Sequence, residues 1–230
     1  MNNLPAGLED CVRCPRLVEH RKRTAKEKRK AYRNHSYWGR PVPGFGDTRA
    51  KVVIIGLAPG AHGSNRTGRM FTGDASGDFL YPALYRAGFS NQARSVDMDD
   101  DLTLQDVWVT SAARCVPPGN RPHRNEIAAC REWLNHDFSQ LPEARIVLAL
   151  GKIAHDAYLD FLKAKGKDLV KARHPFCHGQ FHKLEDQGLP LLDSYHVSFQ
   201  NTNTGRLTKN MFDRILTRVR ELADIPSLCR

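Results

Sequence analysis

Residues 51–80 read KVVIIGLAPGAHGSNRTGRMFTGDASGDFL, and this stretch decides the fold. It opens with an apolar run from Val52 to Leu57 whose first four residues are β-branched, as is typical of a strand buried on both faces of a parallel sheet. A glycine-rich loop follows, and a helical pattern begins at Gly77. Strand, loop and helix in this order indicate an anion- or nucleotide-binding site. The Walker motif and the usual dinucleotide motif are both missing from the stretch.

Three further apolar runs predict strands over 107–112, 145–150 and 189–195, and helical patterns cover 124–137, 153–162 and 208–223. Strands that alternate with helices predict a three-layer α/β/α sandwich around a mainly parallel four-stranded sheet. We expect one domain over residues 1–230, with a cysteine-bearing, basic segment 1–50 packed on it.

Three polar residues, Asp74, Asn120 and His196, follow predicted strands closely. Because parallel strands end at the same edge of a sheet, we expect these side chains to meet there.

The composition favours a polyanionic partner, because the formal net charge is +10. Neither a secretory signal nor an apolar run of membrane-spanning length is visible, so we expect a cytoplasmic protein without a membrane partner. In that compartment cysteines are ligands or free thiols more often than disulfides. Residues 16–33 hold nine lysines and arginines against two glutamates. A helix there has two open interpretations, a solvated face or a contact with nucleic-acid phosphates.

Four of the cysteines have a spacing that is compatible with a metal site. Cys11 and Cys14 form a C-x-x-C, and Cys115 and Cys130 follow about a hundred residues later. Four thiolates can hold zinc or a [4Fe–4S] cluster, and the spacing alone does not decide between them. A second group in residues 174–182 (His174, Cys177, His178 and His182) lacks a second thiol, so we do not expect a zinc site there.

The sequence of the first stretch resembles that of a known family. GLAPG, NRTGRMFTGD and SGDFL, nearly continuous from Gly56 to Leu80, resemble the first motif of the family 5 (type b) uracil-DNA glycosylases. SYHVS, residues 194–198, resembles the second motif, with Val197 where the wider superfamily has proline. The resemblance implies a DNA-repair hydrolase that cuts the N-glycosidic bond of uracil and leaves an abasic site.

The resemblance also implies roles for particular residues. Phe71 would stack on the flipped base and Asn120 would read its Watson–Crick edge. His196 would donate to O2 of the departing uracilate. Other glycosylase families place an acid or amide near Ala58, which cannot position water, so Asp74 becomes the candidate that orients water or balances the charge of the sugar.

Other implied contacts concern the DNA backbone and the metal. Gly56, Ala58 and Gly60 would line the substrate site, and Arg66 and Arg69 would hold the phosphates beside the flipped nucleotide. Leu207, in the segment 200–207, would enter the minor groove as a wedge. The family resemblance implies a structural [4Fe–4S] cluster on Cys11, Cys14, Cys115 and Cys130, and leaves Cys177 and Cys229 as free thiols.

The substrate range is expected to be broad. Pro59 is followed by Gly60 and Ala61, where strict uracil enzymes place an aromatic side chain against C5 of the base, so deaminated purines and bulkier pyrimidines should enter. Two other functions remain: a non-catalytic, metal-cluster nucleic-acid-binding module and a phosphate-handling α/β enzyme for small molecules. We expect a monomer.

Overall fold

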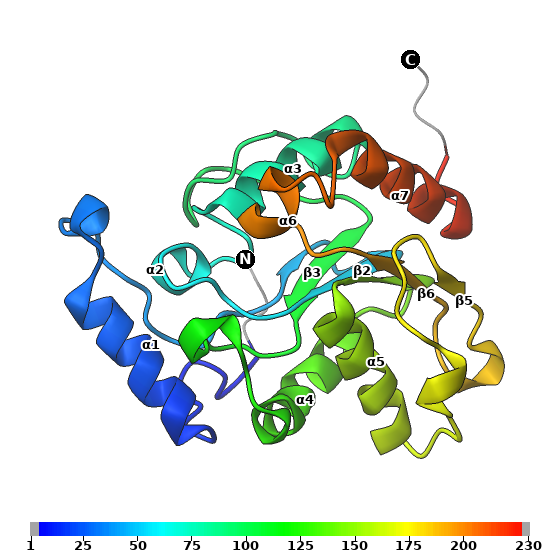
Figure 1. The fold of residues 1–230 in the computed structure, drawn as a ribbon, viewed down its shortest axis with the longest axis horizontal. Helices are drawn as coiled ribbons and strands as arrows, with labels where there is room; N and C mark the ends of the chain where they lie inside the picture. Colours follow the sequence, from blue (N-terminus) through cyan, green and yellow to red (C-terminus); the bar gives the residue numbers. More distant parts are fainter. Residues whose placement is uncertain (1–4, 227–230) are drawn as a thin grey trace.

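The computed structural model describes residues 5–226, with a central sheet between helices (Figure 1). Within these residues, six strands stand in the order β1-β3-β2-β4-β6-β5. The four inner strands run parallel, and the two outer strands pair antiparallel with their neighbours. The strands are β1 Phe45–Gly46, β2 Val52–Gly56, β3 Val107–Ser111, β4 Ile146–Leu150, β5 Phe181–His182 and β6 Leu191–Ser194.

The inner strands are buried on both faces. In β2, Val52 and Ile54 belong to the apolar core on one face of the sheet, whereas Val53 and Ile55 belong to the core on the other. This alternation follows from the two-residue period of a strand. It explains why the run in the sequence is continuously apolar rather than alternating.

Helices form a layer on each face of the sheet. α3 and α7 pack against one core cluster, and α4 and α5 pack against the other (Figure 1). The three-layer α/β/α sandwich is therefore confirmed. The helices are α1 Pro15–Glu27, α2 Ser64–Thr67, α3 Ala75–Arg86, α4 Arg124–Ser139, α5 Lys152–Ala164, α6 Phe199–Asn203 and α7 Lys209–Leu222.

The sheet has two strands more than predicted. β1 and β5 are each two residues long and lie at the two edges. Such short strands leave no readable period in the sequence, and they form because a neighbouring strand offers unpaired N–H and C=O groups. The four predicted strands are the four parallel strands of the centre.

The connections after β2 and β4 leave the sheet toward opposite faces. After β2 the chain reaches α3 on one face, whereas after β4 it enters α5 on the other. Because β2 and β4 are neighbours, their carboxyl ends form a topological switch point, where open parallel sheets bind ligands.

The N-terminal segment is anchored through α1. Arg16 pairs with Glu126 of α4 at 2.6 Å, and Arg13 pairs with Glu132 of the same helix. Arg21 is 3% exposed and donates to the Gly39 carbonyl at 2.6 Å. Other cations of the segment remain exposed: Lys22, Arg23, Lys26, Arg29, Lys30 and Arg33. No helix within residues 5–226 is long and apolar enough to cross a bilayer.

Candidate active site

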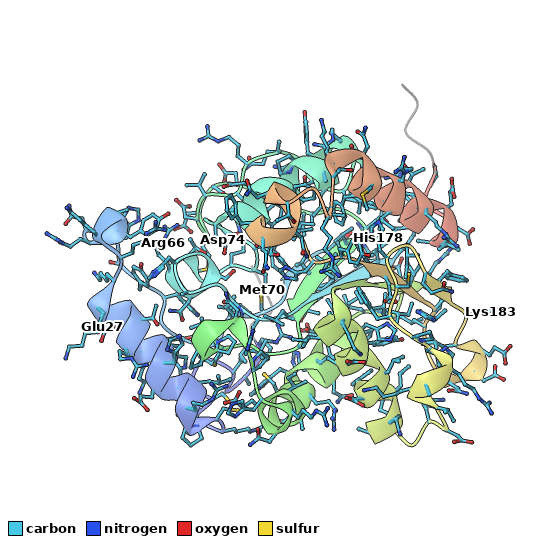
Figure 2. The ribbon with its side chains drawn as sticks, viewed as in Figure 1. Glu27, Arg66, Met70, Asp74, His178 and Lys183 are labelled. Atoms are coloured by element: carbon cyan, nitrogen blue, oxygen red, sulfur yellow. The ribbon has the colours of Figure 1, made fainter. Side chains whose placement is uncertain are left out.

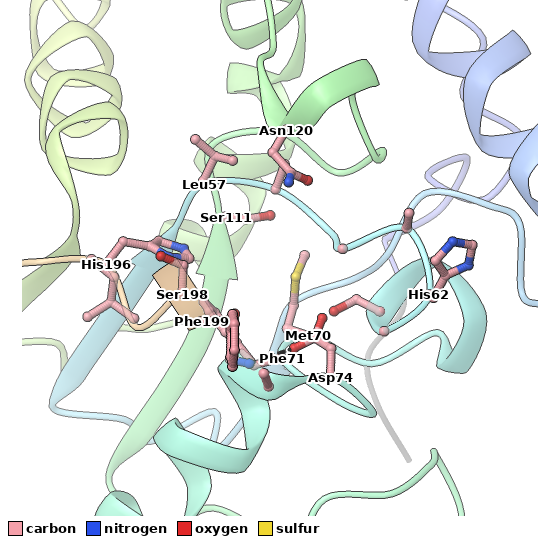
Figure 3. A pocket seen from close by; sticks show the side chains of 18 of the residues that line it. Leu57, His62, Met70, Phe71, Asp74, Ser111, Asn120, His196, Ser198 and Phe199 are labelled. Carbon is pink, nitrogen blue, oxygen red and sulfur yellow. Dashed lines mark hydrogen bonds between the residues drawn. The ribbon is translucent and has the colours of Figure 1, made fainter. Parts of the chain in front are cut away.

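A cavity of about 780 Å³ opens at the carboxyl ends of the parallel strands (Figure 3). Its walls come from the loops after β2, β3, β4 and β6 and from the start of α3. Six of the predicted site residues line it together: Ala58, Gly60, Phe71, Asp74, Asn120 and His196. The three others, Gly56, Arg66 and Arg69, lie outside its wall.

Asp74 caps the N-terminus of α3 and uses only one of its carboxylate oxygens to do so. Oδ1 accepts from the backbone N–H groups of Ser76 at 3.0 Å and Gly77 at 3.2 Å. Oδ2 lies against Gly60 and Gly63, where an added Cβ would come within 2.5 and 2.0 Å of it. Burial raises the pKa of Asp74 above its usual value, outweighing the two backbone bonds. The loop glycines therefore make room for a carboxylate held away from bulk water.

Phe71 forms the apolar floor of the cavity. Its backbone has a φ of +51°, a conformation that costs energy for a non-glycine residue. A Cβ at Gly56 would come within 2.6 Å of the Phe71 ring, and one at Gly77 within 1.8 Å of the Phe71 carbonyl oxygen. Gly56 thus provides space for the Phe71 ring behind the cavity, and its contact with the substrate stays a prediction.

His196 stands two residues after the end of β6, beside Phe71. The two ring centroids are 6.2 Å apart, and both side chains face the cavity in Figure 3. Burial lowers the pKa of His196 to about 4, so its imidazole is neutral at neutral pH. Its carbonyl accepts from the Asn201 side chain at 2.8 Å, and Val197, which replaces the proline, is fully buried. Packing of Val197 holds this loop in place of a proline ring.

Asn120 lies at the rim of the cavity, at the end of the short 3-10 helix Pro118–Asn120. Its backbone φ is +55°, a left-handed conformation that asparagine tolerates better than most residues. Its exposed amide offers a donor and an acceptor, which is what the Watson–Crick edge of uracil requires.

Arg66 braces the loop that carries Asp74. Its Nε donates to the His62 carbonyl at 2.8 Å and its Nη2 to the Gly73 carbonyl at 3.1 Å. The guanidinium lies 4.2 Å from the ring centroid of Tyr32, and Figure 2 shows Arg66, a residue of α2, in the same part of the molecule as Asp74. Two of its nitrogens therefore donate within the protein, and its contact with a DNA phosphate stays a prediction.

Arg69 is buried, which overturns its predicted contact with DNA phosphates. The residue is 3% exposed. Its Nη2 donates to Asp100 at 2.7 Å and to Ser95 Oγ at 3.0 Å, and its Nε donates to Thr72 at 3.0 Å. Asp100, in the loop between α3 and β3, neutralises this arginine. A buried, paired guanidinium cannot reach a phosphate without leaving an uncompensated carboxylate.

Leu207 is also placed differently from the prediction of a minor-groove wedge. It is 1% exposed and belongs to the core beneath α3 and α7. Phe199, at the start of α6, is 63% exposed and lines the mouth of the cavity. Gln200, the first residue of the predicted segment, also lines the cavity, but the exposed apolar side chain here is that of Phe199, just before the segment.

The four predicted ligand cysteines line a single small cavity. Cys11, Cys14, Cys115 and Cys130 surround a space of about 20 Å³ beside the start of α1. Arg114 lines the same space and its N–H donates to Cys130 Sγ at 3.2 Å. Cys177 is exposed and separate from this group, and Cys229 lies outside the described residues.

Several lining residues escaped the sequence prediction. Arg29 and Tyr32 reach the cavity from the N-terminal segment, and Lys152 reaches it from the start of α5. Met70 and Ser111 also line it. The basic run signalled Arg29 only as a member of a charged face, and no local pattern distinguishes the other four.

Comparison with known proteins agrees with this geometry. The family model described as the uracil DNA glycosylase superfamily matches residues 43–220. A type-5 uracil-DNA glycosylase of Thermus thermophilus is 50% identical over 218 residues, covering 95% of this chain and 96% of that protein. The type-5 enzyme of Mycobacterium tuberculosis is 46% identical, covering 96% and 81% respectively. That of Pyrobaculum aerophilum is 45% identical, covering 92% and 88%.

Proposed function

The chain belongs to the uracil-DNA glycosylase superfamily, and we propose that it removes uracil from DNA by hydrolysing the N-glycosidic bond, which leaves an abasic site. The observation that carries this proposal is the arrangement of Asp74 and His196 in one cavity. Asp74 offers Oδ2, which has no hydrogen-bond partner within residues 5–226, and His196 offers a neutral imidazole. A base leaving as an anion and a sugar left as a cation need these two kinds of group.

The base must first leave the DNA stack and enter the cavity. Phe71 provides an apolar face for it, with its ring packed against Gly56 and its backbone carbonyl against Gly77. Asn120 stands at the rim, where its amide can accept from N3–H and donate to O4 of uracil. These two contacts would fix the ring so that O2 faces the His196 imidazole.

Bond cleavage then develops opposite charges on the base and the sugar. At neutral pH the His196 imidazole is neutral, and its N–H can donate a hydrogen bond to O2 of the uracilate while keeping its proton. The carboxylate of Asp74 can balance the positive sugar or orient the water that attacks C1′. Ala58 lines the same wall and offers no polar atom in its side chain, so this task falls to Asp74.

We also propose that the four cysteines hold a [4Fe–4S] cluster with a structural role. Arg114 is 1% exposed, and its Nε and Nη1 have no partner in the described structure, which suits a site for an anionic group. The four thiols share one small cavity, and four thiolates are the donor set that such a cluster requires. The cluster would join α1 to the loop that leads to Asn120.

DNA contact is assigned to the exposed cations rather than to Arg69. Arg29 lines the cavity from the N-terminal segment, and Lys152 lines it from the start of α5. Their positions suit phosphates on either side of a flipped nucleotide. Phe199, exposed at the mouth, suits the gap that the flipped base leaves in the stack.

The substrate range is proposed to extend beyond uracil. A volume of about 780 Å³ lies in the range of pockets for drug-sized ligands, larger than one pyrimidine requires. Gly60 and Ala61 leave the flank beside the base without a bulky side chain. Hypoxanthine and C5-substituted or etheno pyrimidines should therefore enter, with mispaired bases favoured because they flip at lower cost.

The test is single-turnover excision from matched duplexes that differ only in one base, followed by alkaline cleavage at the abasic site. We expect rapid cleavage at uracil and slower cleavage at hypoxanthine. A protein that binds these duplexes without producing abasic sites would instead be the non-catalytic nucleic-acid-binding module. Cleavage at uracil alone would remove the proposed breadth and leave the reaction intact.

A further inference from the structure

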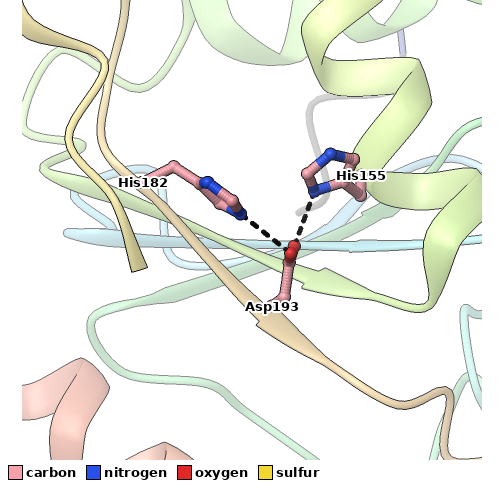
Figure 4. A group of neighbouring side chains, drawn as sticks. All are labelled: His155, His182 and Asp193. Atoms are coloured by element: carbon pink, nitrogen blue, oxygen red, sulfur yellow. Dashed lines mark hydrogen bonds and ion pairs between the residues drawn. The ribbon is translucent and has the colours of Figure 1, made fainter. Parts of the chain in front are cut away.

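A buried group of titratable side chains lies behind the candidate active site. Asp193 of β6 stands between His155 of α5 and His182 of β5 (Figure 4). Their exposed fractions are 0%, 1% and 5%. His155 Nδ1 lies 2.8 Å from Asp193 Oδ1, and His182 Nε2 lies 3.0 Å from Oδ2. The Cys177 backbone N–H also donates to Oδ2, at 3.3 Å.

The partners of His155 fix its protons. Nε2 lies 2.9 Å from the His174 carbonyl oxygen, which can only accept a hydrogen bond. Nε2 must therefore carry a proton. Nδ1 faces a carboxylate oxygen, so a lone pair there would oppose a buried negative charge. The hydrogen-bond geometry therefore needs a proton on both sides of the ring.

The cluster is complete without a metal ion. Asp193 accepts three hydrogen bonds, so both of its carboxylate oxygens have partners. No polar atom of the three side chains stands among the buried atoms without a partner in residues 5–226. Two histidines and a carboxylate are also a common set of metal ligands, so metal content belongs among the tests.

The cluster joins the two elements that hold His196. Asp193 precedes His196 by three residues on the same strand end, and His155 lies in the first turn of α5. At the start of that turn, Gly151 donates to the Ser194 carbonyl at 2.8 Å. A Cβ at Gly151 would come within 3.2 Å of the His196 Cβ, so the backbone there packs directly on the histidine.

The loop before β5 strengthens the same strand end. His178 accepts from the Tyr195 backbone N–H at 3.1 Å, and its ring stacks on Tyr195 with centroids 4.8 Å apart. Gly179 donates to the Asp193 carbonyl at 2.8 Å. The histidine-rich loop thus binds strand β6 along its last residues, immediately before His196.

We propose that His155, Asp193 and His182 are positioning residues for His196: the buried imidazolium–carboxylate–imidazole network fixes the end of β6 against the first turn of α5. This inference rests on the role proposed for His196. The network does not contact the substrate. It affects the reaction by fixing the position of the His196 ring relative to the departing base.

The first experiment changes the network and measures two quantities, single-turnover excision of uracil and affinity for a duplex with a non-cleavable uridine analogue. Asp193→Asn keeps the shape of the side chain and His155→Asn keeps a donor near the Nδ1 position. Since a misplacement of about 1 Å can cost about 100-fold in rate, we expect His155→Ala and Asp193→Asn to lose roughly 10- to 100-fold in excision. DNA affinity should change little, and His155→Asn should recover part of the loss.

Lys171→Ala is the matched control, because Lys171 also links the loop to α5, through Asp160 at 3.0 Å, without touching the network. It should excise uracil at the parental rate. Parental excision by a folded Asp193→Asn protein would overturn the proposal. If the parental protein itself fails to excise uracil, the proposed function is wrong, and the proton assignment must then be decided by spectroscopy.

That second measurement is the ring ¹⁵N spectrum of histidine-labelled protein. We expect His155 to show protons on both ring nitrogens at neutral pH, whereas His196 shows one. The assignment uses the His155→Asn and His196→Ala variants. A spectrum in which no histidine ring is doubly protonated would contradict the network. A stoichiometric divalent metal that is lost in His155→Ala and retained in Cys115→Ser would replace it with a metal site.

Discussion

Asp74 and Asp193 are both partly or fully withdrawn from water, and they differ in how their oxygens are used. Both oxygens of Asp193 accept hydrogen bonds, from His155, His182 and the Cys177 backbone. Asp74 uses Oδ1 for the cap of α3, and no donor within the described residues reaches Oδ2, which lies against glycines beside the cavity.

The difference separates a structural carboxylate from a catalytic one. A buried carboxylate with every acceptor position used stabilises the fold, and losing a partner leaves an uncompensated charge. An oxygen held partly out of water without a partner contributes less to stability, but it can act on a ligand that develops positive charge. The same contrast distinguishes Arg69, whose Nε and Nη2 are paired, from Arg114, two of whose nitrogens are not.

The largest expected effect is that of Asp74→Asn on excision. Asparagine also caps helices, so the free energy of unfolding should stay within about 0.5 kcal/mol of the parental value. Loss of the carboxylate should slow single-turnover excision by roughly 10²- to 10⁴-fold. Chemical denaturation and excision kinetics on the same preparation measure both. If Asp74→Asn loses stability and keeps the parental excision rate, Asp74 is a structural carboxylate like Asp193 and not a catalytic one.

His196→Ala should produce a somewhat smaller loss, about 10²- to 10³-fold, as for removal of one oxyanion donor. The cause is that the uracilate loses its neutral hydrogen-bond donor. Affinity for a duplex with a non-cleavable uridine analogue should change much less than the rate, because this bond strengthens as charge develops. An equal loss in affinity and rate would make His196 a binding residue instead.

Cys115→Ser should lose bound iron and stability together. Cys115 is buried and shares its cavity with three other cysteines, and metal binding to such a site contributes directly to folding. Iron analysis and visible absorption of anaerobically purified protein measure the cluster, and thermal unfolding measures the stability. Cys177→Ser, at an exposed thiol, is the control and should change neither. Colourless, zinc-loaded parental protein would contradict the assignment.

Arg69→Ala should lower stability by about 3 kcal/mol, because it leaves Asp100 without its partner. Although burial opposes ionisation, Arg69 and the backbone bonds lower the pKa of Asp100. The pair therefore contributes fully above the unfolded-state pKa of Asp100, and its contribution is lost as pH falls through the lowered folded value. Urea unfolding of parental and variant protein at several acidic pH values measures this. If Arg69→Ala instead keeps the parental stability and weakens DNA binding, the phosphate contact predicted from the sequence is correct.

Sequence alone predicted the architecture because the central strands carry their own signal. Four continuous apolar runs, each followed by a loop, permit few arrangements other than a parallel sheet between helices. The shared edge of the sheet then brought Asp74, Asn120 and His196 to one cavity, as expected. The edge strands escaped because two residues have no period.

Burial of individual polar side chains was not predictable in the same way. Arg66 and Arg69 are three residues apart in one basic motif, yet one lies over Tyr32 and the other is sealed beside Asp100. That outcome depends on a loop thirty residues further along the chain. Likewise, His155 and Asp193 are distant in sequence, so the local group of histidines around His182 revealed neither partner.

The measurement that tests the account most directly is the pH dependence of single-turnover uracil excision, with the parental protein and Asp74→Asn compared from pH 4 to 9. Asp74 must be ionised, and burial raises its pKa, so the parental rate should climb with pH through a range above that of an ordinary carboxyl group. The rate should then stay level across neutral pH, because His196, with a pKa of about 4, is already neutral there. The Asp74→Asn protein should be slow and lack the climb. A parental rate that falls between pH 6 and 8, as a required imidazolium loses its proton, would contradict the account.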